Sequence, residues 1–260
     1  MIVHFLELIG RHVREGIGNV GFATRSFFTL LGVTPGAFRR PSLISEQIHF
    51  IGNYSLVIIA VSGLFVGAVL GLQGYYTLST YGAEQKLGQV VALALVRELG
   101  PVVTALLFAG RAGTSLTAQI GLMKAGEQLS AMEMMAINPV QRVLAPRFWA
   151  GVVAMPVLAA VFSAVGIFGG YLVGVQLIGV DEGAFWSQMQ AGVDVRADVL
   201  NSVIKSVIFG IAVTFTALFQ GYQAQPTPAD VSRATTRSVV IASLLVWGLN
   251  LIMTALMFNK

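Results

Sequence analysis

Residues 97–139 read RELGPVVTALLFAGRAGTSLTAQIGLMKAGEQLSAMEMMAINP, and this stretch decides the fold. An apolar run there is punctuated by charges, beginning with Arg97 and Glu98, and it continues into a Glu- and Met-rich segment that stops at Asn138-Pro139. A span that only anchors a protein gains nothing from charges inside its run, because each costs free energy in hydrocarbon. The layout is typical of a membrane protein that must also bind a partner.

Composition indicates the same broad class for the whole chain. The 260 residues are 55% hydrophobic and only 11% charged, and their mean hydropathy is +0.77. Soluble domains are about 25% charged, so a soluble globule with this composition could not cover its surface. The apolar runs are continuous rather than alternating, which favours transmembrane helices over a barrel. The sequence therefore predicts an integral all-α membrane protein.

Several kinds of chemistry are excluded or disfavoured. The chain has no cysteine, which excludes disulfides, thiolate metal sites and Cys nucleophiles, and its three histidines form no metal-binding motif. A phosphate-binding loop needs a Lys after its glycines, and the nearest candidate, residues 110–115, lacks one. We expect no cofactor in this chain, so any ATP and Mg²⁺ would be bound by another subunit. The formal charge of +4 fits basic loops beside anionic lipid better than nucleic acid.

Residues 1–34 are predicted to form an amphipathic helix in the membrane interface. No secretory signal is visible, and apolar residues recur at helical spacing while the charges lie largely elsewhere on the wheel. The apolar positions are Phe5, Ile9, Val13, Ile17 and Val20. A helix packed on the body of the protein is the alternative. Breaks are expected at Pro35-Gly36 and at residues 39–41.

Five apolar runs follow, at residues 47–83, 87–123, 148–180, 199–222 and 239–258. The first is roughly 55 Å long as a helix, against about 30 Å of hydrocarbon, so it must tilt, bend or project. We predict five spans in one domain covering residues 1–260.

Basic residues cluster in alternate loops. One set comprises Arg11, Arg14, Arg25, Arg39, Arg40, Lys124, Arg142, Arg147, Arg233 and Arg237, whereas the opposite loops are mainly acidic. The positive-inside rule then puts the N-terminus in the cytoplasm and the C-terminus outside.

Two glycine stripes indicate close helix packing. They are Gly63, Gly67 and Gly71 in the first span and Gly166, Gly170 and Gly174 in the third. Small residues at this spacing let two backbones approach, either within one subunit or at a homodimer seam.

Arg97 and Glu98 are too far apart in angle for a mutual ion pair, since helix neighbours point about 100° apart. One of them is expected to meet another helix or the charged group of a ligand; the alternative is a helix that extends past the membrane and leaves both solvated. At the end of the first span, Gln73 and Tyr81 belong to a set of polar-tipped side chains. These form either an interfacial belt or one wall of a cavity for an amphipathic ligand.

Residues 126–137, GEQLSAMEMMAI, are predicted to form a short helix that Pro139 stops. Leu129, Met132 and Ala136 share one face. Methionine is common on adaptable binding surfaces, so a cytoplasmic helix of this kind suits insertion into a cleft on a partner. A loop helix resting at the membrane interface is the alternative.

The block Glu98–Pro139 resembles the signature of the MlaE permease family of ABC-type lipid transporters, and the resemblance covers nearly the whole chain, including ATTRSVV at residues 234–240. Gln119 departs from the family, where an acidic residue is often expected. The resemblance implies a bacterial inner-membrane homodimer with two cytoplasmic ATPases that bind ATP and Mg²⁺, a STAS-domain subunit and a periplasmic MCE-domain hexamer. It implies transport of phospholipid between the inner membrane and periplasmic carriers, which maintains outer-membrane lipid asymmetry.

The resemblance also implies roles for individual residues. Residues 126–137 would couple to the ATPase through Glu127, Leu129, Met132, Glu133 and Met135. The lipid cavity would be bordered by Leu70, Gln73, Leu78, Tyr81, Arg97 and Glu98.

Two rival functions from other classes remain. A proton-coupled secondary transporter would use Glu98, but inverted repeats are usual for that class, none is visible here, and five spans do not divide evenly. An intramembrane enzyme would need a catalytic constellation within the spans, and the sequence offers none.

Overall fold

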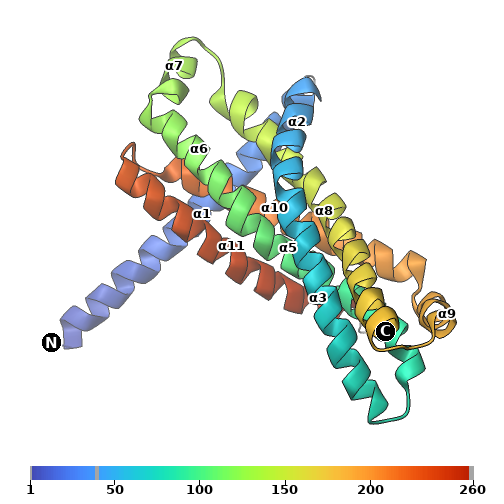
Figure 1. Cartoon of the computed structure of the whole chain (residues 1–260). Helices are drawn as coiled ribbons and strands as arrows, with labels where there is room; N and C mark the ends of the chain where they lie inside the picture. The colour runs from blue at the N-terminus through green and yellow to red at the C-terminus, as the bar shows by residue number, and fades with distance from the viewer. Residues whose placement is uncertain (1, 39–40, 258–260) are drawn as a thin grey trace.

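The computed structural model describes residues 2–38 and 41–257, and over these ranges it is built from helices and turns, without strands (Figure 1). The α-helices are α1 (Ile2–Phe38), α2 (Pro41–Ile48), α3 (Tyr54–Ser79), α4 (Leu87–Ala94), α5 (Gly100–Phe108), α6 (Thr114–Ala125), α7 (Gln128–Met134), α8 (Ala145–Tyr171), α9 (Glu182–Gly192), α10 (Leu200–Gln223) and α11 (Pro228–Met257). Shorter π-helical or 3₁₀ turns are η1 (His49–Asn53), η2 (Glu84–Lys86), η3 (Leu95–Leu99), η4 (Ala109–Gly113), η5 (Val140–Leu144), η6 (Leu172–Leu177) and η7 (Val195–Val199).

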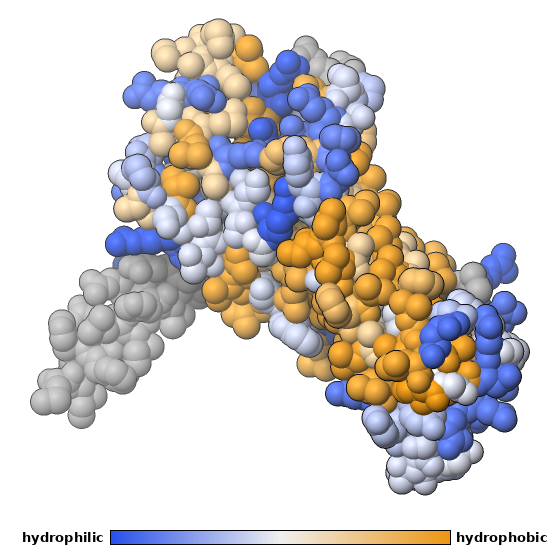
Figure 2. Space-filling model, in the orientation of Figure 1, coloured by the Kyte–Doolittle hydropathy of each residue, from blue (hydrophilic) through white to orange (hydrophobic). Residues whose placement is uncertain are grey.

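Five helical stretches are long and apolar enough to cross a membrane, which confirms the predicted count. They are Pro41–Ser79, Glu84–Ala125, Val140–Leu177, Arg196–Gln223 and Pro228–Met257. Figure 2 shows apolar residues in a band over α3 and α8, with polar residues gathered at the end near α9. The chain is therefore a multi-pass membrane protein.

The second span is divided by two π-helical turns. η3 separates α4 from α5, and η4 separates α5 from α6. A π turn holds one residue more than an α turn and is often found at functional sites. All three charges in the middle of this span lie in these turns, Arg97 and Glu98 in η3 and Arg111 in η4.

Helix α8 is central to the packing, with α3 on one side and α10 on another. The glycine stripe of α3 faces α8 directly: a Cβ atom on Gly63 would lie 2.7 Å from the Phe162 carbonyl oxygen, and one on Gly71 would lie 2.9 Å from that of Gly170. A Cβ atom on Gly67 would come closer still to the Gly166 carbonyl oxygen. The two stripes pack on each other within one chain, so the α3 stripe is not a homodimer seam.

The C-terminal part of α1 packs against the body of the protein. The Phe27 ring lies 5.1 Å from the Phe215 ring of α10 and 6.3 Å from the Phe148 ring of α8. The indole Nε1 of Trp149 donates to the Thr34 hydroxyl at 3.1 Å. These contacts fit the alternative of a helix on the protein body for this part of α1, while Figure 1 shows its first turns projecting away.

The end of α1 differs from the predicted boundary at residue 34. The helix continues through Pro35 and ends at Phe38. Proline removes one backbone donor and its ring crowds the preceding turn of a helix, yet Pro35 lies inside α1 and does not end it. The predicted break at residues 39–40 lies outside the described residues, and α2 begins directly afterwards at Pro41.

Candidate functional site

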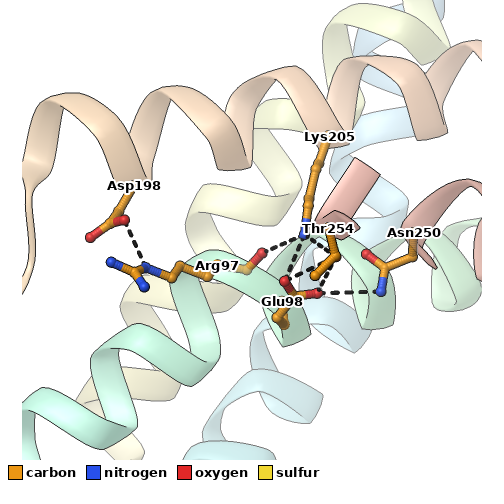
Figure 3. A network of polar contacts seen from close by, with 6 residues as sticks. All are labelled: Arg97, Glu98, Asp198, Lys205, Asn250 and Thr254. Atoms are coloured by element: carbon orange, nitrogen blue, oxygen red, sulfur yellow. Dashed lines mark hydrogen bonds and ion pairs between the residues drawn. The ribbon is translucent and has the colours of Figure 1, made fainter. Parts of the chain in front are cut away.

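The first ion pair of the site joins the second span to the start of the fourth (Figure 3). The Nε of Arg97 donates to the Asp198 Oδ1 at 2.7 Å, and only 5% of the Asp198 side chain is exposed. The other carboxylate oxygen of Asp198 accepts from the backbone N–H of Asp194 at 3.0 Å. Both oxygens of this buried carboxylate are therefore hydrogen bonded.

The second ion pair is formed by Glu98 and Lys205 of α10. The Lys205 ammonium lies 2.8 Å from Glu98 Oε1, and the lysine side chain is 1% exposed. It also donates to the Thr254 hydroxyl at 2.8 Å and to the Arg97 carbonyl at 3.1 Å. A buried ammonium is tolerated only when it is paired and hydrogen bonded in this way.

Two side chains of α11 complete the network. The Thr254 hydroxyl lies 3.1 and 3.2 Å from the two carboxylate oxygens of Glu98, and the Asn250 amide nitrogen donates to Glu98 Oε2 at 3.3 Å. Because a hydroxyl both donates and accepts, Thr254 can bridge Glu98 and Lys205. The network thus joins the second, fourth and fifth spans.

The structure decides between the alternatives for Arg97 and Glu98. Both meet a charged group of another helix, where the sequence predicted such a contact for one of them. Each side chain is 34% exposed, so neither is fully solvated. Sequence reasoning missed the roles of Asp198, Lys205, Asn250 and Thr254. Lys205 carried a usable signal, since it is the only charge within its apolar run.

The residues predicted to border the lipid cavity at the end of the first span are Leu70, Gln73 and Leu78 of α3 and Tyr81 in the turn after it. Leu70 and Leu78 are partly buried against the core, whereas Gln73 and Tyr81 are exposed. The hydrogen bonds of Glu98 described above run to α10 and α11 instead. Three cavities lined by described residues contain no predicted lipid residue in their walls. Their shared role in lipid binding stays a prediction.

The predicted coupling helix exists but is shorter than residues 126–137. α7 covers only Gln128–Met134, because Glu127 and Ala136 adopt left-handed φ angles of 55° and 57°. Beyond its end, the N–H of Ala136 bonds the Glu133 carbonyl and that of Ile137 bonds the Met132 carbonyl, both at 2.9 Å. This is the Schellman pattern, so the helix ends before Pro139 acts.

The predicted coupling residues divide into two groups. Leu129 is buried and Met132 partly buried, so both attach α7 to the body of the protein. Glu127 and Glu133 are exposed, and Met135 is 63% exposed just past the helix. These three side chains are available to a partner.

The fold and the site together describe a class of protein: a multi-pass helical membrane protein with an ionic network shared by three spans and an exposed connecting helix. The family profile described as permease MlaE matches residues 44–256. The chain belongs to the MlaE permease family.

Relatives cover the chain almost end to end. It is 56% identical to the intermembrane phospholipid transport system permease protein MlaE of Haemophilus influenzae, over 100% of this chain and 99% of that protein. It is 34% identical to a probable ABC transporter permease protein of Rickettsia typhi over the full length of both. A probable ABC transporter permease protein of Synechocystis is 31% identical over 88% of this chain and 86% of its own.

Proposed function

We propose that this chain is the transmembrane permease subunit of an ATP-driven ABC transporter. It moves phospholipid between the inner membrane and periplasmic carriers and so maintains outer-membrane lipid asymmetry. The observation that carries the proposal is the full-length 56% identity to a Haemophilus protein named as an intermembrane phospholipid transport permease. The five-span helical fold supports it.

The proposed assembly contains two copies of this chain in the bacterial inner membrane. Two cytoplasmic ATPases bind ATP and Mg²⁺, a STAS-domain subunit accompanies them, and an MCE-domain hexamer lies in the periplasm. The chain itself is non-catalytic and binds no nucleic acid. Its N-terminus is cytoplasmic and its C-terminus periplasmic, which is supported by basic loops on the side of α7.

Coupling to the ATPase is assigned to α7 and its flanking turns. Leu129 and Met132 hold the helix against the body, while Glu127, Glu133 and Met135 face outward. A helix fixed on one face and exposed on the other can transmit a displacement of the ATPase to the second and third spans, which it connects.

The lipid path is assigned to the outer half of α3 together with η3. Leu70 and Leu78 offer apolar contacts, Gln73 and Tyr81 offer polar tips, and Arg97 and Glu98 place charge at the inner end. A lipid site needs this division between an apolar wall and a few polar groups. The proton-coupled alternative gains no support, because the Glu98 carboxylate is held by Lys205 and Thr254.

The test is reconstitution of this chain with its ATPase in vesicles that contain fluorescent phospholipid, with the periplasmic carrier outside. We expect transfer that requires ATP and both proteins, and no ATP hydrolysis by the purified chain alone. Hydrolysis by the pure chain, or transfer driven by a proton gradient without ATP, would overturn the proposal.

The coupling role has its own test. We expect the double variant Glu127→Lys/Glu133→Lys to retain about a tenth or less of the wild-type ATPase after copurification, because reversed charge opposes docking. Arg142→Gln, an exposed change elsewhere on the connecting segment, is the matched control. ATPase retention equal to that control would exclude α7 as the main contact.

A further inference from the structure

A polar cavity of about 490 Å³ lies away from both the ionic network and α7. It is enclosed by the beginning of the first span, the later part of the second and the beginning of the third. Its lining residues are Glu46, Gln47, His49, Phe50, Tyr54, Gln119 and Arg147. Since α7 connects the second span to the third, the cavity lies toward the α7 side of the spans.

Two buried polar atoms of this cavity lack partners among the described residues. The Nε of Arg147 donates to none of them, although its Nη1 donates to the Val143 carbonyl at 3.1 Å. The Oε1 of Gln47 accepts from none of them. Buried polar groups are costly without a hydrogen bond. Arg147 and Gln47 therefore bring a cationic donor group and a neutral acceptor group to one cavity, and a ligand that both accepts and donates suits this pair.

The charges around the cavity also have both signs. The Arg111 guanidinium lies 5.8 Å from the Phe50 ring and 5.3 Å from the Tyr54 ring, so a second cation stands behind two lining residues. Glu46 contributes a carboxylate at the exposed edge. A cavity lined by a guanidinium group, a carboxylate and aromatic rings suits a zwitterion.

We propose that this cavity binds the headgroup of an aminophospholipid, with Arg147 donating to the phosphate and Gln47 and Glu46 accepting from the primary ammonium. The ligand is a lipid rather than a soluble phosphoester because the face of α3 continues past Tyr54 into exposed apolar residues. Val57 is 67% and Ile58 45% exposed, and both offer a surface for acyl chains. The inference rests on the proposed function, because the class of ligand is taken from the proposed lipid transport. It adds a headgroup preference and a second binding position.

The experiment is native mass spectrometry of the full-length chain, purified from micelles holding equal amounts of phosphatidylethanolamine and phosphatidylglycerol. Both lipids carry phosphate, but only the first carries an ammonium. We expect the wild type to retain phosphatidylethanolamine in several-fold preference. Arg147→Gln should lower retention of both lipids by about tenfold, as expected for loss of a charge-assisted hydrogen bond.

Glu46→Gln should bring the ratio of the two lipids close to one while phosphatidylglycerol retention stays unchanged. Glu46 is exposed, so this variant tests the ammonium contact even if Arg147→Gln does not fold. Arg142→Gln, which changes an exposed arginine outside the cavity, is the matched control.

Equal retention of the two lipids by the wild type would overturn the proposal, as would an Arg147→Gln variant that folds and behaves like the control. Soluble glycerophosphoethanolamine added at the lipid concentration should not displace the lipid, and displacement would overturn the choice of a lipid as ligand. Binding is measured without ATPase or ATP, so failure of this site leaves the transport proposal to be tested separately.

Discussion

The fourth and fifth spans lie side by side and share one ionic network, yet their surroundings differ. In the apolar window of Arg196–Gln223, 56% of residues are buried within the chain, against 17% in Pro228–Met257. Large apolar side chains of α11 are therefore exposed, among them Leu244 at 67% and Leu251 at 73%. α10 is therefore an interior helix of the single chain, whereas α11 presents most of its surface to lipid or to a second copy.

The largest expected effect comes from the same substitution on the two spans. A Cβ atom on Gly221 of α10 would lie 2.7 Å from the Thr117 carbonyl, while one on Gly248 of α11 would meet no atom within 4 Å. We expect Gly221→Leu to abolish the folded chain, since the clash is with backbone, and Gly248→Leu to leave it folded. Fluorescence-detected gel filtration of both variants measures this. Similar profiles for the two would break the contrast between the spans.

The next effect concerns the buried ion pair. Lys205→Met should destabilise the folded chain by about 3 kcal/mol, because it leaves the Glu98 carboxylate without its cation. Adding Glu98→Gln should recover most of that loss, since a neutral amide needs no counter-charge. Thermal unfolding in detergent of both single variants and the double variant gives the coupling free energy. Strictly additive effects would show that the pair does not act as a unit.

A smaller effect separates the two exposed helices, α3 and α11. Photo-crosslinkers at Leu70, Leu78 or Tyr81 should capture phospholipid during transport in an ATP-dependent manner, whereas one at Leu251 should capture bulk lipid regardless of ATP. Leu78→Asp should impair transport while the complex still assembles, because a carboxylate opposes acyl-chain binding. Normal transport by that variant, with no ATP-dependent capture at these three positions, would place the lipid path elsewhere.

The smallest effect tests the contribution of α11 to the network. Thr254→Val removes a hydroxyl that contacts both Glu98 and Lys205, and should cost about 1 kcal/mol. Thr236→Val, on an exposed position of the same helix, should change the unfolding temperature little. A cost equal to that control would mean that the Thr254 hydroxyl adds nothing to the network's stability.

Much of the fold could be predicted because membrane spans follow from composition and run length. The glycine stripes predicted close helix packing but not which helix is the partner. A four-residue spacing occurs between two helices of one chain as well as between two chains. The end of α7 could not be predicted from Pro139, because the left-handed turn at Ala136 ends the helix first, and alanine carries no signal for that conformation.

The site was less predictable than the fold. Arg97 and Glu98 are charged residues inside an apolar run, so the sequence indicated that they have partners. It did not identify those partners, because Asp198 was assigned to an external loop. Asn250 and Thr254 looked like ordinary polar residues of the last span. Their meeting depends on three-dimensional packing of the second, fourth and fifth spans. The lining of the polar cavity was equally hidden, since Gln47, Gln119 and Arg147 come from three different spans.

The π-helical turn η3 has a consequence for the register of the second span. Because such a turn holds one extra residue, the residues of α4 and α5 are offset in angle relative to one continuous α-helix. Deleting a single residue within Leu95–Leu99 should restore α-helical spacing and rotate α4 by about 100° against α5. The number of residues in η3 therefore sets the angle by which α4 is rotated about the helix axis relative to α5. Members of the family should therefore tolerate substitutions in η3 far better than insertions or deletions there.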